Sequence, residues 1–385
     1  MIKANYPIDK FRNIRTPFYY YDLKVLRDTL KEINEQITGQ NFVVHYALKA
    51  NVNPSVLKEI KEAGLGADCV SGGEIQAAVN AGIPASKIVF AGVGKADWEI
   101  NLALDNNIFC FNVESIPEVE VINELAAAKN KIASVALRIN PNVDAHTHDY
   151  ITTGLNENKF GINMEDLEKV INVLPKQKNL KLIGIHFHIG SQITDVTAFH
   201  NLCVKISEIE ETLSTYHIEL EHINVGGGLG INYEHPNHFQ IPEFETYFKT
   251  YRDHLPLKSG QTVHFELGRS VVAQCGSLIS RVLYVKEGST KNFAILDAGF
   301  TDLIRPALYQ AYHRIENLSS DLPEEIYDVV GPICESSDVF SKACKLNGTK
   351  RGDIIAIRSA GAYGEIMASQ YNLRALPKAY TSEEI

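Results

Sequence analysis

Short apolar segments with strand-like character recur up to residue 270, and longer segments with helical periodicity lie between them. The strand-like segments are 42–48, 66–70, 87–91, 108–113, 133–139, 180–187, 221–226 and 262–267. The helix-like segments are 54–63, 73–81, 97–107, 116–129, 164–174, 196–216 and 243–254. This alternation predicts repeated β-α units around a parallel sheet, and eight units indicate a closed (β/α)8 barrel of the TIM type.

The pattern changes after residue 269. Here β-prone segments are separated by turns rather than by helices, at 278–285, 293–296, 327–330 and 354–357. Near the N-terminus, a strand-like segment at 18–21 precedes a helix that begins near Asp22. A chain of 385 residues is also longer than a barrel of roughly 250 residues requires. We therefore expect an α/β protein in which residues 29–270 form the barrel, residues 271–385 form a C-terminal β-domain, and residues 1–28 join that domain.

Residues with reactive or hydrogen-bonding side chains, and several glycines, lie at or just after the C-terminal ends of the predicted barrel strands. A barrel of this type has its active site at the C-terminal ends of the strands, so these residues are expected at one rim. They are Lys49, Asp68, Ser71, Arg138, Asn140, His186, His188, Gly190, Ser191, Gly226, Gly227, Gly228, Glu266, Gly268 and Arg269.

Lys49 directly follows the first strand-like segment. A lysine there is either a surface residue or a nucleophile, and taken alone the surface interpretation is the better one. On the same rim, the glycine run 226–230 leaves backbone N–H groups accessible to an anion, and Ser191 adds a hydroxyl donor. A reactive lysine beside an anion site indicates a phosphate-bearing aldehyde, and pyridoxal 5'-phosphate fits this description.

Three further side chains each have two interpretations. Glu266 is suited to hold the cofactor's pyridine nitrogen protonated, or to form an ion pair with Arg269. His188 is suited to lie flat against the ring, although a lone histidine is more often a core residue. His186 should share its face. Metal binding by the two histidines is the alternative, but no third ligand has suitable spacing, so no metal is expected.

Composition limits the classes of partner. The formal charge is -10, with 47 acidic and 37 basic residues and no basic run, which argues against nucleic acid or an anionic membrane as partner. The six cysteines are irregularly spaced and include no C-x-x-C pair, so neither a disulfide framework nor a zinc site is indicated. The first residues lack the pattern of a signal peptide, and no transmembrane segment is evident. We expect a cytoplasmic enzyme that acts on a small molecule.

Eight motifs carry a family resemblance. Those that resemble the alanine-racemase-like, barrel-type pyridoxal phosphate decarboxylases are His45–Asn51, His186–Gln192, Gly226–Gly230 and Glu266–Ser270. Those similar to the diaminopimelate decarboxylases of that family are Asp297–Gly299, Arg305–Tyr309, Gly331–Ser336 and Gly361–Gly364. The resemblance covers nearly the whole chain. It implies decarboxylation of meso-diaminopimelate to L-lysine and carbon dioxide, the last step of bacterial lysine biosynthesis.

The resemblance also implies roles for single residues. Lys49 would be the Schiff-base lysine, His188 would stack on the ring, and Glu266 would contact the pyridine nitrogen. The other implied cofactor residues are Asp68, near the Lys49 end, Ser191, Gly227 and Gly228 at the phosphate, and Gly268, Arg269 and Tyr363. The implied substrate residues are Arg269, Arg305, Tyr309, Glu335 and Tyr363.

The resemblance further implies that Cys334 would donate a proton, and that Cys334 and Glu335 would complete the site of the partner subunit. The resemblance therefore implies a homodimer with shared sites. A buried packing role is the usual one for a cysteine, and only the motif reverses that preference for Cys334.

The chemistry of the substrate agrees with these roles. Guanidinium forks suit a retained carboxylate better than an ammonium does, so Arg269 and Arg305 can bind the distal carboxylate. Glu335 can pair with the distal ammonium. After loss of carbon dioxide, the thiol of Cys334 can supply the proton that replaces it.

Segment 140–162 is long and polar for a barrel connection, and we expect it to be a loop that covers the site rather than a disordered surface insertion. The chain departs from the family pattern at Leu267, usually proline, at Ser337, usually glycine, and at Phe300-Thr301, usually methionine-asparagine. None of these changes removes a charged or nucleophilic group.

Three alternatives remain at this point. A barrel decarboxylase of ornithine, arginine or carboxynorspermidine would share the cofactor residues, but it would not need two arginines for a carboxylate. A racemase of the superfamily would keep the carboxylate. A non-catalytic, cofactor-carrying single barrel would lack the β-domain that contains Cys334 and Tyr363.

Overall fold

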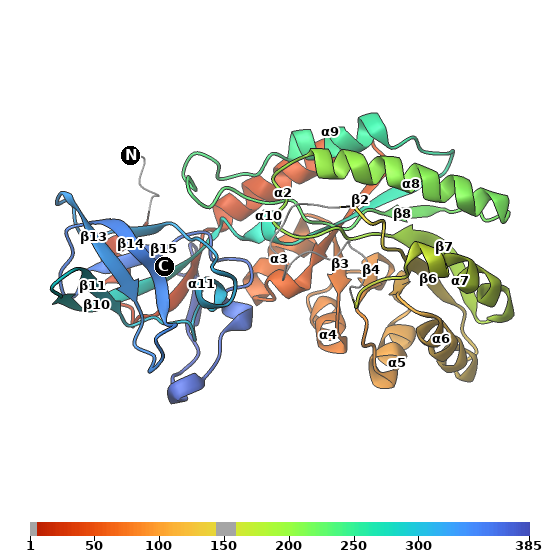
Figure 1. The fold of residues 1–385 in the computed structure, drawn as a ribbon. Helices are drawn as coiled ribbons and strands as arrows, with labels where there is room; N and C mark the ends of the chain where they lie inside the picture. Colours follow the sequence, from red (N-terminus) through yellow and green to blue (C-terminus); the bar gives the residue numbers. More distant parts are fainter. Residues whose placement is uncertain (1–5, 144–158) are drawn as a thin grey trace. The chain divides into compact units, whose positions relative to one another are not determined.

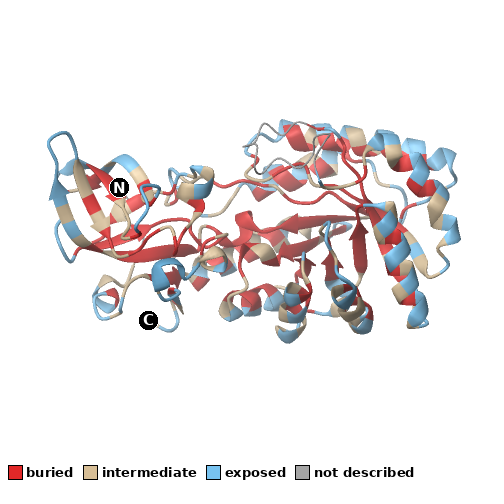
Figure 2. Ribbon diagram, turned by 60° about the horizontal axis from the view of Figure 1, so that its bottom comes forward, coloured by how far each residue is buried: buried red, intermediate tan, exposed pale blue. Residues whose placement is uncertain are grey.

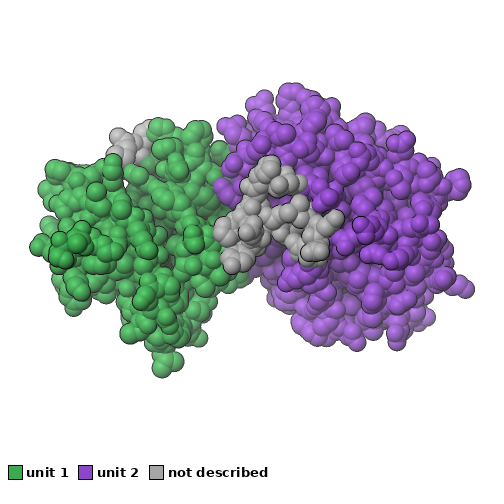
Figure 3. All heavy atoms as spheres, viewed as in Figure 1, with its two compact units in different colours: residues 1–29, 231–242, 269–385 green, residues 30–230, 243–268 purple. Residues whose placement is uncertain are grey.

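The computed structural model describes residues 6–143 and 159–385. The chain forms two compact units, which Figure 3 draws in different colours. The barrel unit comprises residues 30–230 and 243–268, and the β-unit comprises residues 1–29, 231–242 and 269–385. Segment 231–242 therefore belongs to the β-unit, although its place in the sequence lies inside the range expected for the barrel. In the described part of the chain, no helix has the length and apolar character needed to span a bilayer.

Eight parallel strands close into a barrel, which confirms the predicted fold class. In order around the barrel they are β2 (Phe42–Ala47), β3 (Gly66–Cys69), β4 (Ile88–Phe90), β5 (Cys110–Val113), β6 (Ala133–Arg138), β7 (Leu180–His186), β8 (His222–Asn224) and β9 (Thr262–Leu267). The barrel closes through pairing of β2 with β9, in which His45 lies opposite Glu266. Each observed strand lies within its predicted range.

Helices follow the strands as predicted (Figure 1). They are α2 (Leu23–Ile37), α3 (Pro54–Glu62), α4 (Gly72–Asn80), α5 (Asp97–Asn106), α6 (Ile116–Ala128), α7 (Leu167–Val173), α8 (Thr197–Thr215) and α9 (Phe244–His254). Polar caps explain several starts, because Asn53, Ser71 and Ser115 each accept a hydrogen bond from a backbone N–H in the first turn of the helix that follows. The predicted helix 164–174 opens with a 3-10 turn at Met164–Asp166, so α7 is shorter than expected.

Strand β9 shows how alternation divides its side chains. Phe265 packs edge-on against Phe248 and Tyr251 of α9, with ring centroids 4.9 and 5.1 Å apart. His264 and Glu266 alternate with it and therefore face the barrel interior. Figure 2 shows that the strands are largely buried and that the helices are exposed along one side. The interior of this barrel therefore contains polar and titratable groups.

The β-unit contains an eight-stranded sheet. Its main order is β12 (Ile315–Asn317), β15 (Ile354–Ile357), β10 (Gly276–Glu287), β11 (Asn292–Leu296), β13 (Glu324–Val330) and β14 (Val339–Asn347). The remaining two strands lie off this path: β1 (Phe18–Tyr21) pairs antiparallel with β10 and parallel with β16 (Lys378–Thr381). Phe11 of α1 (Ile8–Phe11) packs with Phe18 and Tyr20 in the core of this unit.

The sequence pattern did not predict β12, β14 or β16. Strand β14 pairs with β13 at one end of the sheet, and Lys342 and Lys345 interrupt its apolar pattern. β12 has three residues and β16 has four. Short or edge strands need only a few buried positions, so their periodicity is weak.

Candidate active site

Lys49 lies just beyond β2, in a 3-10 turn at Leu48–Ala50. Its Nζ donates to Asp68 Oδ2 at 2.8 Å. The Asp68 side chain is fully buried, whereas the Lys49 side chain is 36% exposed. Burial, and then the charge of Glu266, raise the pKa of Asp68. In the described part of the chain, the other carboxylate oxygen of Asp68, Oδ1, has no hydrogen-bond partner. A ligand bound beside the Lys49 amine could therefore donate a hydrogen bond to this oxygen.

Glu266 lies in the barrel interior on β9. His186 Nε2 donates to its Oε2 at 3.0 Å. Asn112 and Asn224 donate side-chain N–H groups to its Oε1 at 3.1 and 2.8 Å. Burial acts to raise the pKa of Glu266, but His186, followed by Lys49, holds it well below its usual range. Glu266 is therefore a buried anion held by three neighbours, which differs from the ion pair with Arg269 considered from the sequence.

His188 follows β7 and is held as a neutral ring. Burial, and then the charges of Lys49 and Arg138, lower its pKa well below the usual value. Its Nδ1 accepts from the Gly227 N–H at 3.4 Å. His186 on the same segment is engaged with Glu266, and no group of three or more potential metal-ligating side chains is found in the described residues.

The glycine run after β8 packs tightly against its neighbours. A Cβ at Gly227 would lie 1.9 Å from the Glu266 carbonyl oxygen. A Cβ at Gly228, where φ is +105°, would lie 2.7 Å from the Gly190 carbonyl oxygen. Glycine is thus required for the backbone to pass this close to the adjacent rim segments. Backbone approach without side chains is also what an anion site needs.

Other predicted rim residues have structural partners. Ser71 caps α4. Arg138 donates to Glu114 Oε1 at 3.0 Å and lies 4.8 Å from the Phe160 ring centroid. Asn140 donates to Asn163 Oδ1 at 3.0 Å. Most of the expected covering loop, residues 144–158, lies outside the described residues.

The β-unit brings together four predicted substrate residues. Arg269 begins α10 (Arg269–Val272), and Arg305 begins α11 (Arg305–Tyr309). The guanidinium of Arg269 lies 4.9 Å from the Tyr363 ring centroid, and that of Arg305 lies 6.0 Å from the Tyr309 ring centroid. Arg305 is only 6% exposed, and it forms no ion pair with a carboxylate in the described part of the chain. A buried cation is costly unless an anion pairs with it, so a carboxylate ligand is expected to bind at Arg305.

Among the described residues, no hydrogen bond, ion pair or ring contact joins Cys334 or Glu335 to the arginine group. The Cys334 N–H donates to Asn372 Oδ1 at 3.1 Å, and Tyr371 donates its hydroxyl hydrogen to Glu335 Oε1 at 2.8 Å. Cys334 is the one exposed cysteine of the six, all of which are described. The buried packing role considered for Cys334 is thereby excluded within a single chain.

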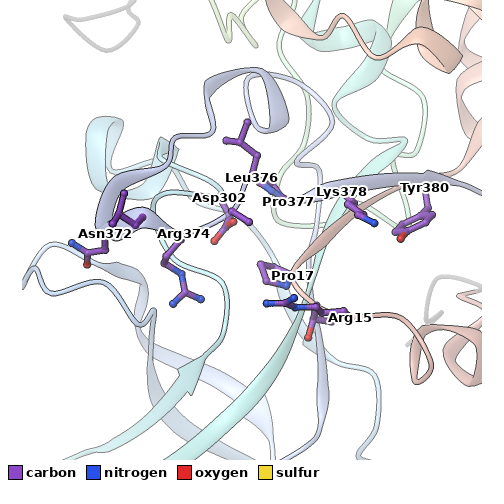
Figure 4. A pocket seen from close by; sticks show the side chains of 12 residues that line it. Arg15, Pro17, Asp302, Asn372, Arg374, Leu376, Pro377, Lys378 and Tyr380 are labelled. Atoms are coloured by element: carbon purple, nitrogen blue, oxygen red, sulfur yellow. The ribbon is translucent and has the colours of Figure 1, made fainter.

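A cavity of about 640 Å³ in the β-unit has a different lining (Figure 4). Its residues are Arg15, Thr16, Pro17, Asp302, Asn372, Leu373, Arg374, Ala375, Leu376, Pro377, Lys378 and Tyr380. None of them was predicted as a site residue. Asn372 of this lining accepts from the Cys334 N–H, so the cavity borders a predicted site residue without containing one.

Sequence reasoning missed several residues of these two groups. Asn112 and Asn224 occupy predicted strands, at inward positions that the alternation of each strand would have identified. Tyr233 and His313 contact the two arginines, but no pattern in the sequence marks them. Their contribution depends on contacts between distant segments.

Comparisons with known proteins agree with this picture. Residues 23–273 match the family model described as pyridoxal-dependent decarboxylase, pyridoxal binding domain. The diaminopimelate decarboxylase of Bacteroides thetaiotaomicron is 68% identical over 385 residues, covering all of both chains. That of Neisseria meningitidis serogroup B is 43% identical, covering 93% of this chain and 86% of the relative. A crystal structure of Helicobacter pylori diaminopimelate decarboxylase complexed with L-lysine is 41% identical, with a TM-score of 0.92, covering 98% of this chain and 94% of that one.

Proposed function

This chain belongs to the pyridoxal-dependent decarboxylases, and we propose that it converts meso-diaminopimelate to L-lysine and carbon dioxide. It is a carboxy-lyase of lysine biosynthesis that uses pyridoxal 5'-phosphate. The observation that carries the substrate assignment is the buried Arg305 guanidinium, which lies among aromatic rings with no carboxylate partner in the described residues. A substrate with a second carboxylate supplies the missing anion.

The barrel residues fit the cofactor. Lys49 has an accessible amine for the aldehyde, and Glu266 is an anion suited to the pyridine nitrogen. His188 is a neutral flat ring suited to lie against the cofactor. We assign the phosphate to Ser191, Gly227 and Gly228, and further contacts to Asp68, Gly268, Arg269 and Tyr363. When bound, the cofactor supplies an electron sink for the bond that is broken.

The β-unit residues fit the part of the substrate that is retained. Arg269 and Arg305 bind the distal carboxylate, for which guanidinium groups are suited by charge and by shape. Tyr309 and Tyr363 border these arginines. Glu335, an exposed carboxylate, pairs with the distal ammonium. Both charges of the retained amino acid then have partners.

Cys334 supplies the proton. The bond between the reacting carbon and its carboxylate breaks, carbon dioxide leaves without the bonding electrons, and the carbon takes a proton from the Cys334 thiol. Its side chain is exposed in the single chain. We therefore place Cys334 and Glu335 in the active site of a second copy of the chain.

Exposed apolar side chains support this homodimer. Tyr371, Leu373 and Leu376 are 48%, 98% and 52% exposed. Tyr371 contacts Glu335, and Asn372 contacts Cys334, so the exposed segment directly adjoins the two residues assigned to the partner. Apolar side chains that remain exposed together are typical of a protein interface.

The six unpaired cysteines support a reducing compartment, so we place the enzyme in the cytoplasm.

The test is carbon dioxide release and product identity from the purified, cofactor-loaded enzyme. It should be given meso-diaminopimelate, ornithine, arginine and carboxynorspermidine in parallel. We expect release from meso-diaminopimelate alone, with L-lysine as the product. Release only from a diamine or polyamine precursor would retain the fold and cofactor but overturn the substrate. No release from any of them would overturn the decarboxylase assignment.

A further inference from the structure

Segment 231–242 lies between β8 and α9 in sequence but packs within the β-unit. Hydrogen bonds from other parts of this unit attach it there. Arg358 Nη1 donates to Asn237 Oδ1 at 2.9 Å, and the side chain of Gln274 donates to the Phe239 carbonyl oxygen. Arg358 is itself held by Glu316 at 2.8 Å. The segment is thereby attached to this unit close to Tyr233.

Tyr233 contacts both arginines assigned to the substrate. Its hydroxyl oxygen accepts from Arg269 Nη1 at 2.7 Å. The guanidinium of Arg305 lies 5.6 Å from the centroid of the same ring. One side chain therefore fixes Arg269 by a hydrogen bond and stabilises the charge of Arg305 through its π-face.

His313 also contacts Arg305, and its ring lies edge-on to that of Tyr233, with centroids 5.1 Å apart. It is 2% exposed, and its Nδ1 lies 2.9 Å from the Arg358 carbonyl oxygen. A carbonyl oxygen can only accept, so Nδ1 carries the hydrogen and Nε2 is left as the acceptor. Arg305 Nε donates to that Nε2 at 3.3 Å. Burial, and then the charge of Arg305, lower the pKa of His313 to about 3, so the ring is neutral at physiological pH.

This arrangement decides which part of Arg305 remains for a ligand. Its Nε–H is used by His313, so the two terminal NH2 groups form the end-on fork that matches a carboxylate. Tyr233 and His313 are neutral groups, and they stabilise the guanidinium without neutralising it. If a carboxylate side chain stood in place of Tyr233 or His313, it would pair with the arginine and leave it unavailable to the carboxylate of the substrate.

We propose that Tyr233 and His313 are positioning residues that preset Arg269 and Arg305 for the retained carboxylate of the substrate. This inference rests on the proposed function, because it takes the two arginines as the carboxylate site. It adds two residues that determine how the enzyme distinguishes an amino acid tail from a bare amine. Neither residue needs to touch the reacting carbon.

The test compares two ligands that differ in this one group. L-Lysine keeps the retained carboxylate, and cadaverine lacks it. The affinity of each for the cofactor-loaded enzyme should be measured by titration calorimetry and as an inhibition constant. The variants are Tyr233→Phe, His313→Leu and His313→Gln, and the control is Tyr284→Phe, which removes a phenolic hydroxyl from a side chain 59% exposed on β10.

We expect Tyr233→Phe to weaken lysine binding by about 10-fold, the usual effect of losing one hydrogen bond to a charged group, and to leave cadaverine binding within about two-fold. The KM for meso-diaminopimelate should rise by a similar factor while kcat changes little. His313→Leu should behave in the same way, and His313→Gln should recover part of the loss because its carboxamide oxygen can replace the Nε2 acceptor. Tyr284→Phe should match the unmodified enzyme.

Each other outcome identifies which claim fails. If the unmodified enzyme binds lysine and cadaverine equally, the arginines do not bind a carboxylate and the proposed substrate contacts are wrong. If it prefers lysine and the variants keep that preference, the positioning roles alone are wrong. If a variant loses both ligands equally, its residue has a general structural role and the inference is also overturned. Should His313→Leu fail to fold, Tyr233→Phe and His313→Gln decide the result.

Discussion

His186 Nε2 donates to the Glu266 carboxylate at 3.0 Å inside the barrel, between two strands that are not adjacent. This contact does more than satisfy a buried acid. It lowers the pKa of Glu266 despite complete burial of the carboxylate. An anion is thus maintained where the cofactor's ring nitrogen is assigned, and two carboxamides hold its other oxygen.

Replacing this anion should slow the reaction. Glu266→Gln keeps the size of the side chain but removes the charge that favours a protonated pyridine nitrogen, so we expect kcat to fall by at least about 100-fold. Steady-state kinetics with saturating cofactor would measure the effect. Glu210→Gln is the matched control. Glu210 lies on α8, outside the barrel interior, and it is a buried carboxylate that accepts a hydrogen bond from the side chain of Gln261. Unchanged kcat in the Glu266 variant would remove Glu266 from its assigned role.

Lys49 should be required for firm retention of the cofactor. Lys49→Ala removes the amine that bonds to the aldehyde, so the visible absorption of the bound cofactor should disappear after dialysis. Lys58→Ala, a change at a side chain 65% exposed on α3, should keep it. Absorption spectra before and after dialysis test this directly. A band that survives in the Lys49 variant means that another residue attaches the cofactor.

Mixed dimers should reveal the shared active sites. Lys49→Ala and Cys334→Ala chains should each be nearly inactive alone. Mixing them under conditions that exchange subunits would place an intact Lys49 from one chain opposite an intact Cys334 from the other. Random pairing makes half of the dimers mixed, each with one intact site, so on the order of a quarter of the unmodified activity should return. Activity that stays at the level of the separate variants would show that Cys334 serves its own chain.

Acid should destabilise the barrel through a chain of three histidines. His45 Nε2 lies 2.8 Å from His264 Nδ1, and His264 Nε2 lies 2.9 Å from His222 Nδ1. Burial lowers the pKa of His45 to about 4 and that of His264 well below its usual value, and it also lowers that of His222. Since the unfolded chain binds these protons near pH 6.5 and the folded chain does not, stability should fall as the pH drops below 6.5.

For His45 alone, the loss between pH 7.5 and pH 5 should be roughly 2 kcal/mol in the free energy of unfolding. Urea unfolding at the two pH values would measure it. The pH dependence should be smaller in His45→Gln and unchanged in His238→Gln, which alters an exposed histidine. Equal pH dependence in all three proteins would exclude His45 as a source.

Sequence reasoning succeeded where the local pattern carries the information. Each observed barrel strand lies within its predicted range, because short apolar segments bounded by helical patterns mark the strands in the sequence. The rim residues Lys49 and Glu266 followed from topology, since parallel strands all end at the same side of a barrel. The starts of α3, α4 and α6 lie at or next to their predicted positions, and the structure shows that local caps at Asn53, Ser71 and Ser115 fix them.

The prediction missed the edge strand β14, which pairs with a neighbour on one side only. Few of its positions need to be buried, so its pattern of apolar residues is weak. The partner of Glu266 was left open between the cofactor and Arg269, and neither choice identified His186. The two residues are 80 positions apart in sequence. Such a contact depends on how the barrel closes and on which rotamers fit inside it.

The sequence by itself determined the series of barrel strands, the rim on which the reactive residues lie, and the family to which the motifs point. Those properties depend on periodicity and on residue identity at fixed spacings, which a single chain displays directly. Only the tertiary structure decided that segment 231–242 packs within the β-unit, that Tyr233 and His313 hold the two arginines, and that three histidines join inside the barrel. These are contacts between distant segments, and their geometry exists only after the backbone has folded.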